Sequence, residues 1–268
     1  MTSSVIIEQL KREKILELLN QGKRIDGRGL HDQRPLSIET GVIPKANGSA
    51  RVKLGYTEIV TGVKIQPDKP FPDLGDKGIL ICTAEILPLA DPKAEPGPPG
   101  EEVIELARVV DRGIRETEMI DLKQLVLIKD KSVIGIFVDS SVLNTDGNLF
   151  DACSYAAVAA ILSCTVPKYE VKDDVPTLVE GVTSKAPIKT IPVSVTMARI
   201  GDYIIVDPTA DEEACMNARI TITTNSDGNI CALQKGGSDG FTIEQLFKCS
   251  EIALSVGTKV RKQLEQLM

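Results

Sequence analysis

Aromatic residues are scarce in this sequence. Only 3% of the 268 residues are Phe, Tyr or Trp, and tryptophan is absent altogether. Proteins that bind single-stranded nucleic acid through its bases usually stack those bases on exposed aromatic side chains. The shortage of aromatics therefore argues against a broad base-stacking platform.

Positive charge is also in short supply. The chain carries 31 Lys and Arg residues against 38 Asp and Glu residues, which gives a formal net charge of -7. A chain with this balance does not coat nucleic acid through bulk positive charge. Any contact with nucleic acid must therefore be local.

Long apolar runs are missing as well. No segment approaches the roughly 18 consecutive apolar residues that a membrane-spanning helix needs. The opening residues, MTSSVIIEQLKREK, lack the apolar segment and cleavage site of a secretory signal peptide. We therefore expect a cytoplasmic protein without a membrane partner.

Metal-ligating residues are few and dispersed. His31 is the single histidine, and the six cysteines include no Cys-x-x-Cys pair. Structural zinc sites need clustered Cys or His ligands, so we expect neither a metal nor a cofactor. His31 is interpreted as a polar loop residue.

The chain does contain clear helical and β-type segments. Gly and Pro punctuate short β-type runs between segments of helical periodicity. The order strands-helix-strands-helix, then strands-helix again, predicts an α+β fold of two lobes with mostly antiparallel or mixed sheets. We assign residues 1–185 to the N-terminal helix and first lobe, and residues 186–268 to the second lobe. Predicted helices span residues 5–20, 101–119, 151–164 and 241–268. Predicted strands span residues 36–43, 48–55, 58–65, 78–87, 124–130, 132–143, 177–182, 190–200, 203–206, 219–225 and 229–234.

Residues 24–64 carry the most specific pattern, and it resembles the opening signature of the RNase PH family. The strings ELARVVDRGIRE at 105–116, VDPTADEE at 206–213 and QKGG at 234–237 extend the resemblance over nearly the whole chain. Within the family, the sequence is most similar to the archaeal exosome ring subunit generally described as non-catalytic. The signature residues are Arg24, Asp26, Gly27, Arg28, Arg34, Gly41, Gly48, Ser49 and Gly55.

The resemblance implies both an architecture and a chemistry. It implies an RNase PH-like fold and a hexameric ring in which this chain alternates with a catalytic paralogue beneath RNA-binding cap subunits. Active members carry out phosphorolysis, in which inorganic phosphate attacks the last phosphodiester of single-stranded RNA. That reaction needs a cationic, N–H-rich pocket for phosphate and a carboxylate near the scissile bond.

The catalytic parts that the resemblance predicts are absent from this sequence. Active members have a Gly-Gly-Thr-Arg-like string before the buried helix, whereas this chain has Asn148, Leu149 and Phe150 where the donors should stand. Leu and Phe cannot hydrogen-bond an anion, and burying phosphate against them would cost several kcal/mol. Asn217 falls where active members have the carboxylate, and an amide carries neither the charge nor the proton. We therefore expect no catalytic residues.

A row of arginines on the predicted helix 101–119 is the positive evidence for RNA. Arg108, Arg112 and Arg115 lie within about 60° of one another on a helical wheel, roughly opposite the apolar stripe. In the family, the equivalent helix contributes arginines to RNA binding, so the resemblance implies that role here. The alternative is intrahelical ion pairing, of Glu105 with Arg108 and of Asp111 with Arg115.

Two further segments receive structural interpretations. Arg24, Asp26 and Arg28 look like a ligand cluster, but a loop held by Arg–Asp pairs is favoured. The segment PDKPFPDLGDKG at 67–78 is interpreted as a surface loop, with a place along a central pore as the alternative.

The hypotheses for function come from different classes. We favour a non-catalytic, RNA-binding ring subunit of a phosphorolytic 3′→5′ exosome. The alternative is an active phosphate-dependent exoribonuclease with a non-standard phosphate site. A metabolic enzyme or kinase is disfavoured, because the sequence has no G-x-x-x-x-G-K-[ST] loop.

Overall fold

The computed structural model describes residues 3–92, 94 and 97–267. The helices in this part of the chain are α1 (Ser3–Asn20), α2 (Glu101–Glu116), the 3-10 turn η1 (Leu122–Leu125), α3 (Leu149–Leu162), α4 (Ala210–Cys215) and α5 (Ile243–Glu265). The strands are β1 (Leu36–Thr40), β2 (Gly48–Leu54), β3 (Thr57–Asp68), β4 (Ile79–Ile86), β5 (Val126–Ile128), β6 (Ser132–Asn144), β7 (Thr165–Lys172), β8 (Val175–Lys185), β9 (Val193–Ile200), β10 (Tyr203–Val206), β11 (Ala218–Thr224) and β12 (Ile230–Gly236).

The first sheet has the strand order β1-β2-β3-β6-β4, and β5 pairs with the start of β6. Side chains along β3 alternate between buried and half-buried positions over most of its length, as expected of a strand with one face on the core. β4 and β6 run parallel, whereas β6 pairs with β3 in antiparallel fashion. A parallel pair needs a crossover connection, and here the crossover contains α2.

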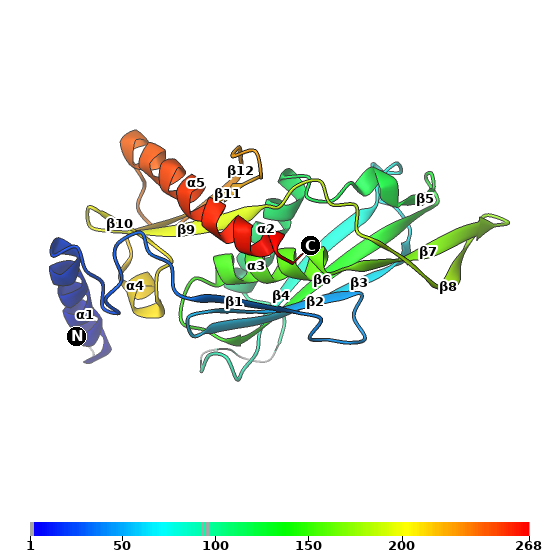
Figure 1. Ribbon diagram of the computed structural model, residues 1–268. Coiled ribbons are helices and arrows are strands. Elements are labelled where there is room, and N and C mark those ends of the chain that lie inside the picture. The colour runs from blue at the N-terminus through cyan, green and yellow to red at the C-terminus, as the bar shows by residue number, and fades with distance from the viewer. Residues whose placement is uncertain (1–2, 93, 95–96, 268) are drawn as a thin grey trace.

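The second sheet has the strand order β10-β9-β11-β12, and each neighbouring pair is antiparallel. α3 packs between this sheet and the first one, while α5 covers the opposite face of β9 and β11 (Figure 1). Because α3 meets protein on both sides, it is apolar nearly all round, and Phe150 to Ile161 are all buried.

A seam of buried hydroxyl groups joins α3 to the second sheet. Ser154 on α3 donates to Ser194 at 3.1 Å, and Ser194 in turn pairs with Thr223 at 2.8 Å. Thr196 pairs with Thr221 at 2.9 Å two register positions along. Each of these hydroxyls therefore has a partner, which removes most of the cost of burying it.

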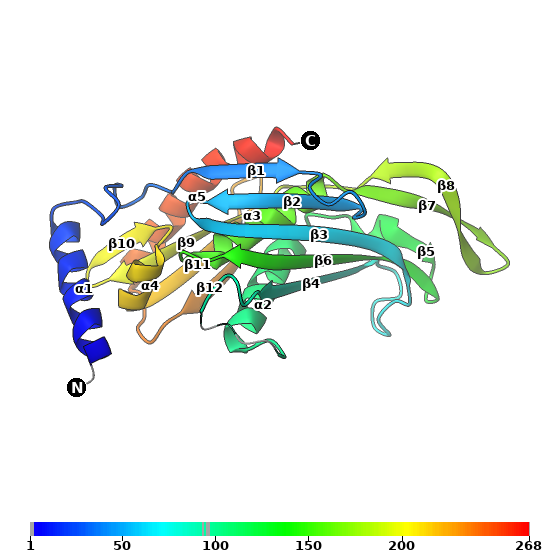
Figure 2. The same ribbon diagram turned by 90° about the horizontal axis from the view of Figure 1, so that it is seen from below.

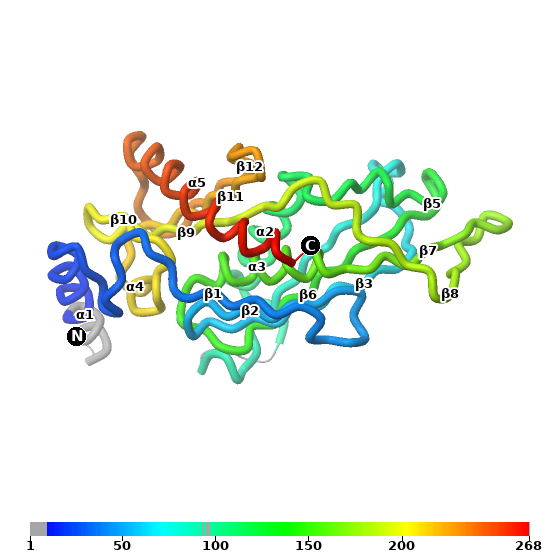
Figure 3. The backbone as a smooth tube through the Cα atoms, viewed as in Figure 1, coloured from blue at the N-terminus to red at the C-terminus, as the bar shows by residue number. Residues whose placement is uncertain are grey.

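Two elements lie outside the layered body. The hairpin β7–β8 projects from one end of the molecule as a separate two-stranded ribbon (Figure 2). At the opposite end, α1 lies beside α4 (Figure 3). α1 buries Ile15 and Leu19 against Ala198, Ile200 and Ile205 of the second sheet. In space, α1 therefore packs on the second lobe, although it precedes the first lobe along the chain.

The predicted α+β class and its two sheets are confirmed, and most predicted elements lie within a few residues of the observed ones. A turn at 225–228 joins β11 to β12, with Gly228 at a φ of +81°. β7 and α4 were missed. The segment between β4 and α2 includes residues 93, 95 and 96, which lie outside the described part of the chain. Residue 268 of the last predicted helix also lies outside it. None of the described helices is long and apolar enough to cross a membrane.

Candidate functional site

A buried ion pair joins the two lobes behind the site. Asp207, which follows β10, accepts hydrogen bonds from Arg34 at 2.7 Å through Nη2 and at 2.9 Å through Nε. Arg34 also donates to the carbonyl oxygen of Asp146 at 2.6 Å, just before α3. Burial works against ionisation of Asp207, but the hydrogen bonds and charge of Arg34 outweigh it and hold the pKa of this carboxyl below its ordinary value.

The signature residues of the loop at 24–34 are structural. Arg28 pairs with Asp26 at 2.6 Å and with Asp207 at 3.0 Å. Arg24 is fully buried, but it pairs with Glu212 of α4 instead of Asp26. The interpretation of this cluster as a loop held by Arg–Asp pairs is confirmed, and the ion pairs extend to residues of the second lobe.

The N-terminus of α3 lies where the resemblance implies a phosphate site. Asn148 is the N-cap and adopts a left-handed conformation with a φ of +51°. Its backbone N–H donates to Oε1 of Glu213 at 2.9 Å. Its side-chain amide donates to Asp207 at 2.7 Å and to Asp151 at 2.9 Å. Asn148 therefore points its donors at the protein's own carboxylates.

These carboxylates close the helix N-terminus to an external anion. Burial raises the pKa of Asp151 to about 7, and burial likewise raises the pKa of Glu213 to about 7. Asp207 stays ionised beside them. A phosphate entering here would have to displace Glu213 and would meet like charge from Asp207, which outweighs the attraction of a helix N-terminus for anions.

The two residues after Asn148 supply no replacement for the missing donors. Leu149 is half-buried, and Phe150 is buried beneath the guanidinium of Arg219, whose Cζ lies 3.9 Å from the ring centroid. Arg219 is itself paired with Glu105 at 2.8 Å. Sequence reasoning missed Arg219, because no local pattern connects β11 with the start of α3.

Asn217 has a structural role away from the start of α3. Its Oδ1 accepts a hydrogen bond from the backbone N–H of Gly201 at 2.9 Å and one from Arg12 of α1 at 3.3 Å. The side chain thus holds the β9–β10 turn and the N-terminal helix. Asn217 and Asn148 make their hydrogen bonds to different parts of the protein.

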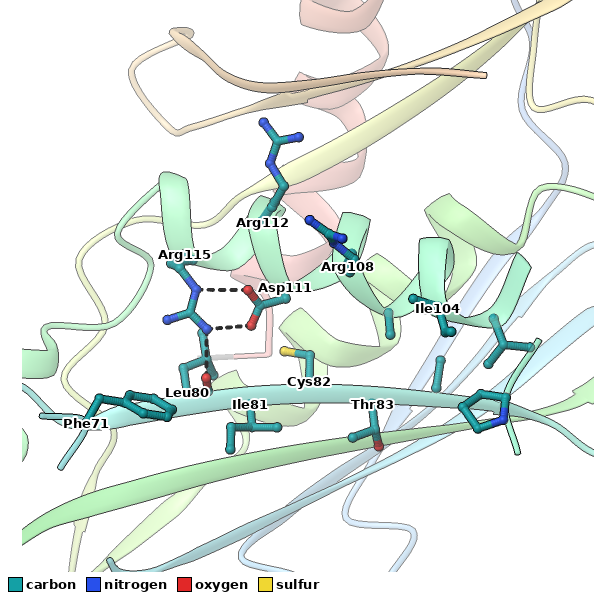
Figure 4. Close-up of a pocket in the computed structure, with 14 residues that line it drawn as sticks. Phe71, Leu80, Ile81, Cys82, Thr83, Ile104, Arg108, Asp111, Arg112 and Arg115 are labelled. Carbon is teal, nitrogen blue, oxygen red and sulfur yellow. Dashed lines mark hydrogen bonds and ion pairs between the residues drawn. The ribbon is translucent and has the colours of Figure 1, made fainter. Parts of the chain in front are cut away.

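The predicted arginine row divides into two kinds of residue (Figure 4). Arg108 and Arg112 are exposed, and no hydrogen bond or ion pair joins either to another residue in the described part of the chain. Arg115 pairs with both oxygens of Asp111, at 2.8 and 2.7 Å, and donates to the carbonyl oxygen of Leu80 at 2.7 Å. The side-chain hydrogen bond with Asp111 is the main reason that the pKa of Arg115 is raised.

The ion-pairing alternative for this row is correct at one position and wrong at another. Asp111 does pair with Arg115 one turn along the helix. Glu105, however, faces β11 and β12, where it accepts from Arg219 at 2.8 Å and from Gln234 at 3.0 Å. Arg108 is therefore left without its expected intrahelical partner.

Two clefts flank the unpaired arginines. A cleft of about 460 Å³ lies between α2 and β4, and another of about 330 Å³ lies between α2 and β12. Arg108 and Arg112 line both of them. The acidic residues Glu105 and Asp111 also line these clefts, but each is paired with another arginine, Glu105 with Arg219 and Asp111 with Arg115. The unpaired guanidiniums of Arg108 and Arg112 can therefore attract a polyanion.

The described residues contain no group of three His, Cys, Asp or Glu side chains arranged to hold a metal ion. No disulfide bond joins cysteines in the described part of the chain.

Comparison with known proteins identifies the family. Domain 1 of the 3′ exoribonuclease family matches residues 32–167, and domain 2 of that family matches residues 190–256. The chain belongs to the RNase PH family. Arg34 of domain 1 pairs with Asp207 of domain 2, and so joins the two family domains. Arg24 and Arg28 precede domain 1 and pair with Glu212 and Asp207 of domain 2.

Several family members are similar over their full length. Exosome complex component Rrp42 of Thermococcus gammatolerans is 44% identical, covering 98% of this chain and 97% of that protein. The protein of the same name from Pyrococcus abyssi is 45% identical, covering 98% and 96%. A chain in the structure of the Archaeoglobus fulgidus exosome with RNA bound to the active site has a TM-score of 0.89 and 43% identity, covering 96% of this chain and 99% of that one. Rice Rrp46, at 18% identity and a TM-score of 0.70, shares the fold.

Proposed function

We propose that this chain is a non-catalytic, RNA-binding ring subunit of an exosome that degrades or processes RNA in the 3′→5′ direction by phosphorolysis. One observation supports the proposal that the chain is non-catalytic. The N-terminus of α3 is occupied by the carboxylates of Glu213 and Asp151 instead of being open to phosphate. Leu149 and Phe150 add no donor. The chemistry then belongs to a paralogous partner subunit.

The partners we propose follow from the relatives. Proteins similar over their full length bear the name of an exosome component, and similar chains occur in archaeal exosome structures. We propose an alternating hexameric ring with a catalytic RNase PH-like paralogue, topped by RNA-binding cap subunits. No disulfide bond joins the described cysteines, which suits the reducing cytoplasm that we propose as the compartment. Along the sequence, we divide the chain at 185/186 into two domains.

The RNA contacts that we propose are Arg108, Arg112 and Arg115. The first two are exposed and unpaired, so they can bind phosphates without breaking an existing ion pair. They lie one helical turn apart, about 6 Å along the axis, which suits neighbouring phosphates of an extended strand. Arg115 keeps its Nη1 amino group without a partner among the described residues, while its other donors fix its position.

The alternative is an active phosphate-dependent exoribonuclease, and a direct assay separates the two functions. The purified chain alone should release no nucleoside diphosphates from a single-stranded RNA in the presence of phosphate, whereas the complex with its paralogue should release them. Robust, phosphate-dependent release by the chain alone would establish the alternative.

The RNA contact is tested in the assembled complex. Arg112→Glu should weaken RNA binding and reduce the slope of log affinity against log salt by about 1, because one phosphate contact is lost. Lys259→Glu is the matched control, since it makes the same charge change at an exposed position of α5. Equal affinities and salt slopes for the Arg112 variant and the unmodified complex would refute the contact.

A further inference from the structure

The cleft between α2 and β4 has the size and lining of a small-molecule subsite. Its volume of about 460 Å³ falls in the range of pockets that hold one ligand group. Ile81 and Thr83 form its lower margin, Cys82 points from β4 toward α2, and Ile104 lies at one end (Figure 4). The RNA contact proposed above uses only the arginines on the upper margin of the cleft. It assigns no role to the interior of the cleft.

The charges around the cleft favour an anionic ligand. Asp111 is the acidic residue that lines it, and Arg115 occupies both of its carboxylate oxygens. Arg108 and Arg112 on the margin have no such partner. The cleft thus combines an apolar interior with two unpaired guanidiniums, which suits a ligand with a flat, largely uncharged part and flanking negative charges.

β4 offers hydrogen-bonding groups to such a ligand. It is the outer strand of its sheet, and no described strand pairs with its free edge. The carbonyl oxygen of Leu80 points to that edge, because it accepts from Arg115. Since backbone groups of alternate residues face the same side of a strand, the N–H and C=O groups of Cys82 and Ala84 also face the free edge.

An extended peptide is a poorer candidate for this edge. A peptide that adds a strand to a sheet needs an uninterrupted ladder of free backbone groups. Arg115 already occupies the carbonyl oxygen of Leu80, which interrupts the ladder near its start. A planar base, by contrast, needs only one or two of the remaining groups.

An exposed phenylalanine completes the subsite. Phe71 lies in the loop at 67–78 and is 44% exposed, and it stands at the end of the cleft opposite Ile104 (Figure 4). The loop is held in place where the backbone N–H of Asp130 donates to the carbonyl oxygen of Gly75 at 3.0 Å. Every nucleobase has a face that can stack on such a ring, whatever its sequence.

We propose that the α2–β4 cleft is a nucleobase subsite for single-stranded RNA. One base enters the cleft and stacks on Phe71, its polar edge meets the free backbone groups of β4, and the phosphates on either side of it lie on Arg108 and Arg112. This inference rests on the proposed RNA-binding function and adds a contact that requires a base.

Strands with and without bases test the proposal. The assembled complex is held in phosphate-free buffer, so that no phosphorolysis occurs, and is titrated with a fluorescent single-stranded RNA or with the same strand carrying abasic residues. Phe71→Ala should weaken binding of the normal strand on the order of 5- to 100-fold and leave the abasic strand unchanged. Phe71→Tyr should restore binding of the normal strand.

Two further variants show whether a negative result refutes the nucleobase subsite alone or also the proposed arginine contact with RNA. Arg112→Ala should weaken both strands, whereas Tyr56→Ala, an exposed aromatic on the β2–β3 turn, should weaken neither. If Arg112→Ala weakens binding but Phe71→Ala affects both strands equally or not at all, the subsite is refuted and the arginine contact stands. If Arg112→Ala also has no effect, the proposed RNA contact itself fails.

Cross-linking identifies the occupant directly. RNA carrying 4-thiouridine and irradiated in the complex should form adducts on residues 71–84 of this chain, and Phe71→Ala should reduce their yield. Adducts found only outside residues 71–84, or a yield on these residues that Phe71→Ala leaves unchanged, would overturn the proposal.

Discussion

At the scale of single residues, the α3 N-terminus shows how a phosphate site is lost without loss of the fold. Glu213 supplies a carboxylate oxygen to the backbone N–H of Asn148, so the helix end is satisfied from within the chain. Asn148 fastens the same helix end to Asp207 of the second lobe. The residues that replace the expected donors therefore stabilise the site as a structural joint.

The stability of the folded protein should depend on pH through the titration of Glu213. Its pKa of about 7, raised by burial from 4.5, means that the native state binds a proton that the unfolded state has released. Stability from this group is thus complete below about pH 4.5 and is lost as pH rises toward about 7. Glu213→Gln keeps an acceptor for Asn148 but does not titrate, so the variant should gain stability relative to the unmodified chain as pH rises through this window.

Urea unfolding of both proteins across this pH range measures the effect. Glu251→Gln, on the exposed face of α5, is the control and should follow the unmodified chain at every pH. Parallel stability curves for Glu213→Gln and the unmodified chain would contradict the prediction.

Substitutions of two α2 arginines should have different effects on the stability of the chain and on its affinity for RNA. Arg115→Ala removes two hydrogen bonds to Asp111 and one to Leu80, so we expect it to lower the free energy of unfolding by about 1 kcal/mol. Arg108→Ala removes no interaction within the described chain and should change stability by less than about 0.5 kcal/mol while weakening RNA binding. Denaturant unfolding and RNA titration of both variants provide the two readouts, and an equal loss of stability would show that Arg108 is also structural.

At the scale of elements, periodicity predicted what local residues determine. The apolar stripe of α2 and the continuous apolar run of α3 predicted these helices correctly. In each helix, the pattern of apolar residues reflects which sides of the helix face the core. β7 was missed because Pro167 and alternating charges obscure a strand that is stabilised by pairing with β8. α4 was missed because its six residues are held by the capping box of Thr209 and by the partners of Glu212, which are distant in sequence.

The same distinction applies to the site. The loss of phosphate donors at 148–150 is visible in the sequence, since it concerns the identity of adjacent residues. The roles of Glu213, Arg219 and Asn217 depend on contacts between segments far apart along the chain, and no pattern in the sequence records them. Arg108 and Arg115 looked equivalent on a wheel because the wheel does not include β4 or β12.

The packing of α1 on the second lobe gives a prediction about that element. Leu19→Ala removes a side chain that is buried against the second sheet and should cost about 2–5 kcal/mol, less where the gap collapses. Leu10→Ala, on the same helix but 60% exposed, should change stability by less than about 0.5 kcal/mol. Thermal unfolding of the two variants checks this, and similar melting temperatures would show that α1 contributes little to the lobe.

At the scale of the whole molecule, the two lobes are held together by charge as well as by the helix between them. Arg34 reaches from the loop before β1 to Asp207 in the second lobe and to the carbonyl oxygen of Asp146. Removing the guanidinium would leave Asp207 buried without its main partner. Arg34→Met should therefore cost about 3–5 kcal/mol.

A surface arginine provides the comparison. Arg51 pairs with Glu58 on the first sheet, but its side chain is 40% exposed, so Arg51→Met should cost no more than about 1 kcal/mol. Denaturant unfolding of both variants measures the difference. Comparable losses would mean that the Arg34–Asp207 pair does not couple the lobes.

At this scale, the net charge of -7 affects unspecific binding of RNA. Most basic side chains that line the interior and the joint between the lobes are paired with acidic groups, whereas Arg108 and Arg112 stand free beside two clefts. Excess negative charge elsewhere on the chain then disfavours unspecific binding of RNA, so the RNA binding that we propose depends on local contacts with Arg108 and Arg112.

The parallel pairing of β4 with β6 has a consequence for how the molecule folds. The two strands meet only after the chain between them, including α2 and β5, has looped back, so this contact is non-local and slows folding. The cleft and its arginines lie on that crossover. The cleft should therefore be complete only once β6, which follows it along the chain, has been made and has paired with β4.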